Sequence, residues 1–197
     1  NYLDTLVGRE GSRADAARLP RHAFLEHFLD EAGGIEEFAA GDGATARFGR
    51  VVWETAELNR TLPEVLLRTT GVVRAAGREA AVRLEKRFVF RPRSIDVYYR
   101  VAPADDARLR VRLGVEINVS LAARTGAGGR LFLVGEDAST EIGTDARDIL
   151  RATGLLVRDV KNGVSITISS AAPFRCWSLP IETAAAGGPE YQCQCLV

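Results

Sequence analysis

The sequence predicts an all-β fold, and three observations support this prediction. From Ala46 onward, short segments rich in Val, Ile, Leu, Phe and Tyr are separated by Gly, Asp, Pro and Asn, which is typical of strands and turns. Several segments alternate strictly between apolar and polar residues. Asn162–Gly163 is a strong hairpin signal, because this dipeptide adopts the positive φ angles of a tight turn.

The alternation gives each predicted strand one apolar face. In the segment 82–91, Val82, Leu84, Phe88 and Phe90 alternate with charged residues, and 95–101 behaves in the same way. The segment Arg108–Leu121 continues the pattern over a length that exceeds the usual 5 or 6 residues of a strand. Such one-sided sheets bury their apolar faces on each other, so we expect a two-sheet antiparallel β-sandwich.

Further strands are expected along the rest of the chain, which gives about nine or ten in all. They are Ala46–Glu54, Glu64–Val73, Arg130–Val134, Gly154–Val160, Gly163–Ser169, Phe174–Ile181 and Tyr191–Leu196. Two segments fit helical turns instead: Arg21–Glu31 and Thr144–Arg151. No linker or repeat divides the sequence, so residues 1–197 are expected to form a single domain.

Composition excludes several classes of protein. A chain of 197 residues with 46% hydrophobic residues can form a real core, which excludes disorder. The 26 basic and 26 acidic residues cancel, which argues against a nucleic-acid partner or an anionic membrane bound through a basic surface. No apolar run approaches the 18 to 20 residues (roughly) of a membrane span, and no signal peptide is present at Asn1–Glu10.

The cysteines favour a reducing compartment. Cys176, Cys193 and Cys195 make an odd count, and the last two lie too close in sequence for an easy mutual disulfide. We therefore expect a cytoplasmic protein. The sequence contains no methionine, which suggests an excerpt from a longer polypeptide.

Common catalytic and cofactor motifs are absent. The sequence has no phosphate loop, dinucleotide fingerprint, zinc pair or Gly-x-Ser-x-Gly elbow, so we expect neither a cofactor nor a metal. His22 and His27 are spaced so that they fall on different sides of a helix or opposite faces of a strand, which disfavours joint metal binding. A single histidine could act as a general base with Glu26 or Asp30 nearby, but we expect packing and hydrogen bonding to explain both histidines.

One polar row suggests carbohydrate binding. Glu116 and Asn118 lie on the polar face of the long predicted strand, and Tyr98 and Trp177 supply aromatic rings. Sugars bind through bidentate polar partners and through C–H contacts with aromatic platforms, so these four residues are the tentative carbohydrate-binding site. The alternative is a solvated sheet face with cross-strand charge pairs.

Lys86 is an anomaly in the pattern. Alternation places it on the apolar face between Leu84 and Phe88, although it is one of only two lysines. A buried amine must be paired or neutral. We expect a structural ion pair with a carboxylate, and Glu182 is the tentative partner.

Five stretches, taken together, resemble the C-terminal region of the α-amylase and 4-α-glucanotransferase group in glycoside hydrolase family 57. The two most specific motifs are Pro-Ile-Glu-Thr after a tryptophan and Glu-x-Asn on a long strand. The stretches, in order, are 1–6, 21–29, 84–88, 114–118, and 177–183 with 191–192.

This resemblance implies a β-sandwich of the galactose-mutarotase-like type packed against a catalytic (β/α)-barrel, which acts on α-1,4-glucans with retention through two acidic residues. Those carboxylates belong to the barrel and have no counterpart here. The chain is then expected to be a non-catalytic C-terminal domain, with the barrel and possible α-glucan as its partners. Its sequence departs from the family at Ala184–Gly188 and at Cys193 and Cys195.

Two other functions fit the residues. A stand-alone mutarotase or epimerase would use a glutamate and a histidine, with Glu116 or Glu182 and His22 or His27 as candidates. A free carbohydrate-binding module would need a coplanar row of exposed aromatic rings, but Trp53 lies in an apolar run that resembles core.

Overall fold

The computed structural model describes 23–40, 44–48, 51–75, 77–106, 108, 110–120, 129–134, 139–142, 146–160, 162–185 and 188–196. Within these ranges, only the backbone is described for 44–47, 120, 129–133, 139, 180–185 and 188–196. The strands are β1 (Leu25–Leu29), β2 (Ala44–Arg47), β3 (Glu54–Asn59), β4 (Glu64–Ala75), β5 (Arg78–Phe90), β6 (Ile95–Pro103), β7 (Arg112–Ser120), β8 (Gly129–Val134), β9 (Ser139–Glu141), β10 (Arg147–Asp159), β11 (Val164–Ala185) and β12 (Gly188–Leu196). A short helix, α1, spans Ile35–Ala40.

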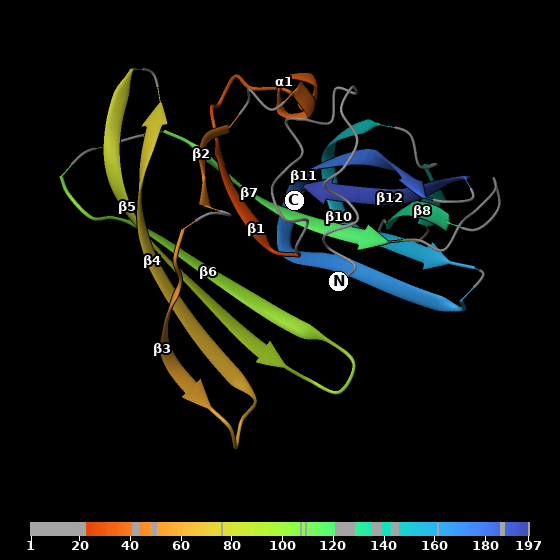
Figure 1. Cartoon of the computed structure of the whole chain (residues 1–197), viewed down its shortest axis with the longest axis horizontal. Coiled ribbons are helices and arrows are strands. Elements are labelled where there is room, and N and C mark those ends of the chain that lie inside the picture. The colour runs from red at the N-terminus through yellow and green to blue at the C-terminus, as the bar shows by residue number, and fades with distance from the viewer. Residues whose placement is uncertain are drawn as a thin grey trace.

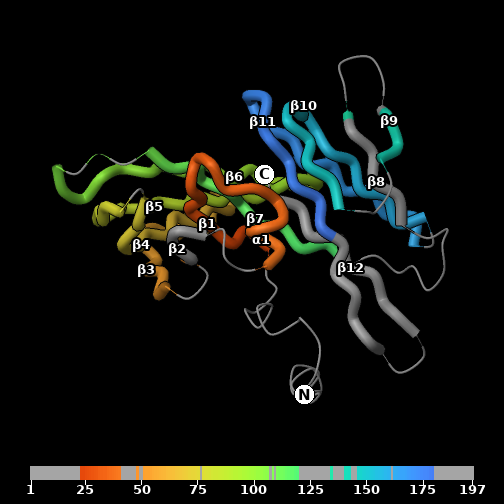
Figure 2. Tube along the Cα trace, turned by 90° about the horizontal axis from the view of Figure 1, so that it is seen from above, coloured from red at the N-terminus to blue at the C-terminus, as the bar shows by residue number. Residues whose placement is uncertain are grey.

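The strands form two antiparallel sheets, which confirms the predicted all-β class. One sheet has eight strands in the order β2-β1-β7-β12-β11-β10-β8-β9, and the other has four in the order β3-β4-β5-β6. Figure 1 shows the four-stranded sheet beside β1 and β2, with the rest of the larger sheet on the other side of the molecule. Figure 2 shows α1 next to β1. Strand β1 therefore lies between the smaller sheet and α1.

The alternation seen in the sequence corresponds to the two faces of the four-stranded sheet. On β5, Val82, Leu84 and Lys86 are buried, whereas Arg83 and Arg87 are exposed. The buried face packs on β1 through a cluster that contains Phe28, Phe48, Val73, Val82 and Leu84. Burial of each such side chain contributes about 1.5–3 kcal/mol, so this cluster holds the two sheets together.

A glycine on β4 allows the sheets to approach closely. A Cβ at Gly71 would lie 2.7 Å from Cζ of Phe48, closer than nonbonded carbon atoms pack. The Phe48 ring also contacts Phe28, with ring centroids 5.0 Å apart. Gly71 therefore makes room for the central aromatic pair of the core.

The larger sheet has a second cluster of its own. It contains Val119, Ala152, Leu155, Val157 and Cys176, from β7, β10 and β11. The hairpin between β10 and β11 confirms the Asn162–Gly163 turn: Gly163 has a φ of 64°, and the Asn162 N–H donates to the Asp159 carboxylate at 3.0 Å.

Both predicted helical segments are wrong. Leu25–Leu29 forms β1 and Arg147–Asp159 forms β10, while the helix lies at Ile35–Ala40. All five residues of β1 are buried, because the smaller sheet covers one face and α1 with Trp177 covers the other. Apolar residues on both faces of a strand imitate a helical pattern, which explains the error.

Other boundaries also differ from the prediction. The expected strand Ala46–Glu54 is replaced by β2 and β3, with Trp53 just before β3. The two strands expected at Gly163–Ser169 and Phe174–Ile181 are one long strand, β11, whose pairing with β10 shifts register twice. The long predicted strand Arg108–Leu121 is β7, Arg112–Ser120.

Candidate functional site

Two consecutive residues of β1 carry the buried polar groups of this region. Successive side chains of a strand point to opposite faces, so Glu26 points toward the smaller sheet and His27 toward α1. Glu26 is 1% exposed and His27 is 3% exposed. Each must therefore find a partner within the protein.

Glu26 is paired with Lys86 across the two sheets. The Lys86 ammonium donates to Oε1 of Glu26 at 2.6 Å and to the backbone oxygen of Phe24 at 3.0 Å. It also lies 4.5 Å from the centroid of the Trp53 ring. The Tyr99 hydroxyl donates to the same carboxylate oxygen at 3.0 Å.

Lys86 thus faces a carboxylate as predicted, but the partner named from the sequence is corrected. The carboxylate is that of Glu26, which lies 60 positions away in the sequence. The backbone of Glu182, on β11, pairs with Tyr191 of β12. The side chain of Glu182 lies outside the described part of the chain. An apolar run interrupted by Glu26 and His27 was the signal that could have indicated the buried partner.

The Glu26 cluster changes the acidity of Tyr99. Burial raises the pKa of the Tyr99 hydroxyl well above its ordinary value, and the nearby Glu26 carboxylate raises it further. A charged phenolate beside a buried carboxylate would be unfavourable. Tyr99 therefore remains a hydrogen-bond donor to Glu26 throughout the physiological pH range.

His27 contacts a second carboxylate on the opposite face of β1. Its Nε2 lies 2.7 Å from Oε2 of Glu116, and the Asn118 amide donates to Oε1 of Glu116 at 2.7 Å. Register places Leu25 opposite Glu116 and His27 opposite Gly114, so His27 and Glu116 share a face. The Phe38 ring of α1 packs edge-on against His27, with centroids 5.1 Å apart.

This pairing brings together two residues considered for the mutarotase alternative. His27 and Glu116 contact each other directly and are both buried. Neither lines the cleft described below. His22 lies outside the described residues, as does the side chain of Glu182. Sequence spacing does not reveal the contact, because strand pairing between β1 and β7 creates it.

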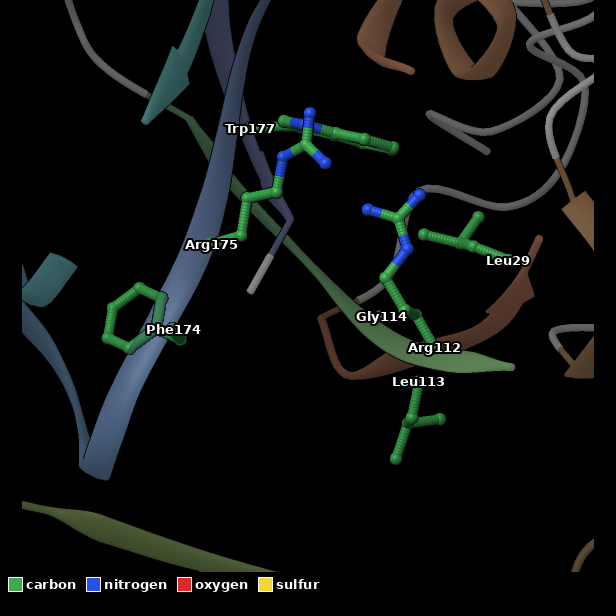
Figure 3. A pocket seen from close by; sticks show the side chains of 7 residues that line it. All are labelled: Leu29, Arg112, Leu113, Gly114, Phe174, Arg175 and Trp177. Carbon is green, nitrogen blue, oxygen red and sulfur yellow. The ribbon is translucent and has the colours of Figure 1, made fainter. Parts of the chain in front are cut away.

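Trp177 lies beside a cleft between β7 and β11, shown in Figure 3. The cleft has a volume of about 290 Å³, and it is lined by Leu29, Arg112, Leu113, Gly114, Phe174, Arg175 and Trp177. The guanidinium carbons of Arg112 and Arg175 lie 5.7 and 5.4 Å from the Trp177 ring centroid. Because Trp177 is only 3% exposed, little of its ring is accessible to a sugar.

The two arginines of the cleft have different partners. Arg175 donates to both carboxylate oxygens of Asp148, at 2.9 and 2.5 Å. This hydrogen bonding lowers the pKa of Asp148 and raises the pKa of Arg175. Arg112 instead donates to the backbone oxygens of Asp30 and Gly33, which fixes the chain just before α1.

Tyr98 lies apart from the other proposed carbohydrate ligands. It is on β6 of the smaller sheet, is 52% exposed, and has the Arg87 guanidinium 5.2 Å from its ring centroid. Because Lys86 faces the larger sheet, its neighbour Arg87 and the paired Tyr98 face away from it. The row of Glu116 and Asn118 therefore does not face the row that contains Tyr98.

The outward face of the smaller sheet carries cross-strand ion pairs. Arg68 contacts Glu85 at 2.7 Å, Arg87 contacts Glu64 at 3.1 Å, and their side chains are partly exposed. Exposed pairs of this kind contribute about 0–1 kcal/mol each. This face matches the alternative of a solvated sheet face.

The described residues contain no group of three or more histidine, cysteine, aspartate or glutamate side chains placed to hold a metal ion. Within the same part of the chain, no helix has the length and apolar character needed to cross a membrane.

Comparison with known proteins gives two findings. A solved structure of 4-alpha-glucanotransferase from Thermococcus litoralis is similar, with a TM-score of 0.66, 17% sequence identity and coverage of 91% of this chain. This chain spans 26% of that protein's chain, and the similarity establishes the fold. No curated protein matches the sequence significantly.

The second finding concerns the family. Residues 15–186 match the profile described as alpha-amylase/4-alpha-glucanotransferase, C-terminal, which covers most of the sequence. The match agrees with the similarity of the fold. The chain therefore belongs to the alpha-amylase/4-alpha-glucanotransferase C-terminal family.

Proposed function

We propose that this chain is the non-catalytic C-terminal β-sandwich domain of a glycoside hydrolase or glucanotransferase that acts on α-1,4-glucans. Its role is to stabilise the catalytic barrel of the same polypeptide. The family match supports the assignment. A cytoplasmic location is part of the proposal, supported by the odd number of cysteines.

The observation that carries the non-catalytic role is the mutual pairing of the buried ionisable groups. Glu26 is held by Lys86 and Tyr99, and Glu116 by His27 and Asn118. A general acid or base must reach the substrate directly or through one water. The cleft at Trp177 is lined by neither pair, so these groups contribute to stability and not to proton transfer.

The proposal is tested by deletion in the longer enzyme. Removal of the region that corresponds to this chain should shorten the half-life of amylose-degrading or glucan-transferring activity at elevated temperature. The initial rate of the shortened enzyme, measured before inactivation, should equal that of the full-length enzyme. If the shortened enzyme retains its full half-life, the stabilising role is wrong.

Carbohydrate contact is a second candidate function, favoured by the exposed ring of Tyr98. Arg87 beside it and the carboxylates of Glu64 and Glu85 supply polar partners on the same face. Calorimetric titration with maltoheptaose tests this function. Tyr98→Ala should abolish any binding heat, whereas Trp177 and Glu116 are too buried to make the first contact and the half-buried Asn118 donates to Glu116.

A stand-alone mutarotase or epimerase is the third candidate, because Glu116 and His27 are in contact. Such an enzyme needs both groups on either side of a sugar ring. The direct 2.7 Å contact leaves no space for a sugar between them. We therefore favour the stabilising role.

A further inference from the structure

The cleft at Trp177 is lined by polar side chains of one kind. Its polar side chains are the guanidinium groups of Arg112 and Arg175, which are hydrogen-bond donors. Leu29, Leu113 and Phe174 supply apolar surface. Figure 3 shows the guanidinium groups of Arg112 and Arg175 close to the Trp177 ring. A ligand that fits this cleft must therefore present hydrogen-bond acceptors to the donors and a small uncharged body to the apolar surface.

The charges of the cleft also favour a ligand with acceptor groups. Among the described contacts, Arg175 is neutralised by Asp148, whereas Arg112 is held by the backbone oxygens of Asp30 and Gly33, which carry no net charge. Among the described side chains at the cleft, the two guanidinium groups and the Asp148 carboxylate carry one excess positive charge beside an apolar surface. A guanidinium is well suited to bind a carboxylate or a phosphate group.

We propose that this cleft is a binding site for a small oxyanion, a carboxylate or phosphate group on a small uncharged body, held by Arg112 and Arg175 beside Trp177. The site is independent of the proposed function, since it requires neither a glucan nor a catalytic barrel.

Asp148 acts as an internal competitor at this site. Its two oxygens occupy Nε and Nη2 of Arg175, which are the donors that would otherwise form a bidentate contact with a ligand. Removal of this charge, while the side-chain shape is kept, should therefore strengthen anion binding. This gain cannot result from unfolding, which would weaken binding.

Trp177 provides a direct readout. The sequence has two tryptophans, so Trp53→Phe leaves Trp177 as the single indole emitter. The Trp53→Phe protein is titrated at constant ionic strength with butyrate, with inorganic phosphate and with 1-butanol. Butyrate or phosphate should produce a saturable change in fluorescence, and 1-butanol should not. The relative response to the two anions identifies the favoured oxyanion.

Asp148→Asn, made in the same background, should tighten anion binding by about three- to tenfold, as expected for one partly exposed charge pair. Asp96→Asn is the matched control, because it releases Arg91 on the other sheet and should leave the affinity unchanged. If Asp148→Asn disrupts folding, as judged by circular dichroism, Arg175→Gln is used and should weaken binding by a similar factor.

Three results would overturn the anion site. The first is that neither butyrate nor phosphate produces a saturable response, in the Trp53→Phe protein or in its Asp148→Asn variant. The second is a response to 1-butanol as strong as that to butyrate. The third is an equal gain in affinity with Asp96→Asn, which would show attraction to net charge alone.

Discussion

The Lys86 ammonium on β5 contacts the Glu26 carboxylate on β1 at 2.6 Å, and this contact joins the two sheets within the core. Both side chains are almost fully buried, and Tyr99 and the Phe24 carbonyl complete their hydrogen bonds. Loss of one partner leaves the other charge buried and unpaired. The free-energy cost of this unpaired charge is far larger than the net stabilisation that the intact pair provides.

Lys86→Ala should therefore lower the free energy of unfolding by about 3–5 kcal/mol. Denaturant unfolding monitored by circular dichroism measures this. Arg87→Ala is the control on the same strand, because Arg87 is half exposed and should cost less than about 1 kcal/mol. Equal stability of Lys86→Ala and the parent protein would contradict the buried pair.

The free energy of unfolding of Glu116 variants should depend strongly on the shape of the residue that replaces Glu116. Glu116→Ala leaves His27 and Asn118 without their shared acceptor and should cost about 2–4 kcal/mol. Glu116→Gln keeps an acceptor oxygen and should cost about half as much. The two values come from the same unfolding measurement, and equal costs would mean that the hydrogen bonds contribute little.

Tyr99 should make the protein less stable in alkali. Its pKa is raised in the folded state above the ordinary value of 10.0. Above that pH the unfolded chain releases the proton and the folded chain retains it, so stability falls as pH rises. The contribution is fully present below pH 10.

Tyr99→Phe removes this titrating group, and its stability should decline less steeply above about pH 10. Unfolding midpoints of the two proteins, measured at a series of alkaline pH values, give the comparison. Parallel curves would show that Tyr99 does not titrate differently in the folded and unfolded states.

Gly71→Ala should destabilise the core by about 1–3 kcal/mol, because the new methyl group would collide with the Phe48 ring. The double variant Gly71→Ala/Phe48→Leu should be less destabilised than the sum of the two single variants. Strict additivity in thermal unfolding would mean that the two positions are not in contact.

Strands β4, β5 and β6 of the smaller sheet could be predicted because their apolar and polar residues alternate, whereas β3, which is exposed along its whole length, was not predicted. The alternation around Lys86 identified the buried apolar face of β5 and the unusual position of a lysine on that face. The partner could not be identified, because Glu26 reaches Lys86 through the packing of two sheets and not through sequence spacing. Local patterns contain no information on such a contact.

Strand β1 shows where pattern analysis fails. It is covered on both faces, so Leu25, Phe28 and Leu29 are all buried and the period of two disappears. The same burial from both sides explains why Glu26 and His27, one residue apart, have partners in different layers. The cleft arginines were missed for a similar reason, because β7 and β11 are brought together only by the order of strands in the sheet.

We propose that this chain does not catalyse a reaction on sugars. The most direct test is to assay the 197-residue chain for amylose turnover and for glucose mutarotation. We expect rates equal to those of the buffer alone in both assays. Turnover that is lost in Glu116→Gln or His27→Gln, while the variants remain folded, would contradict it and would establish the buried pair as catalytic.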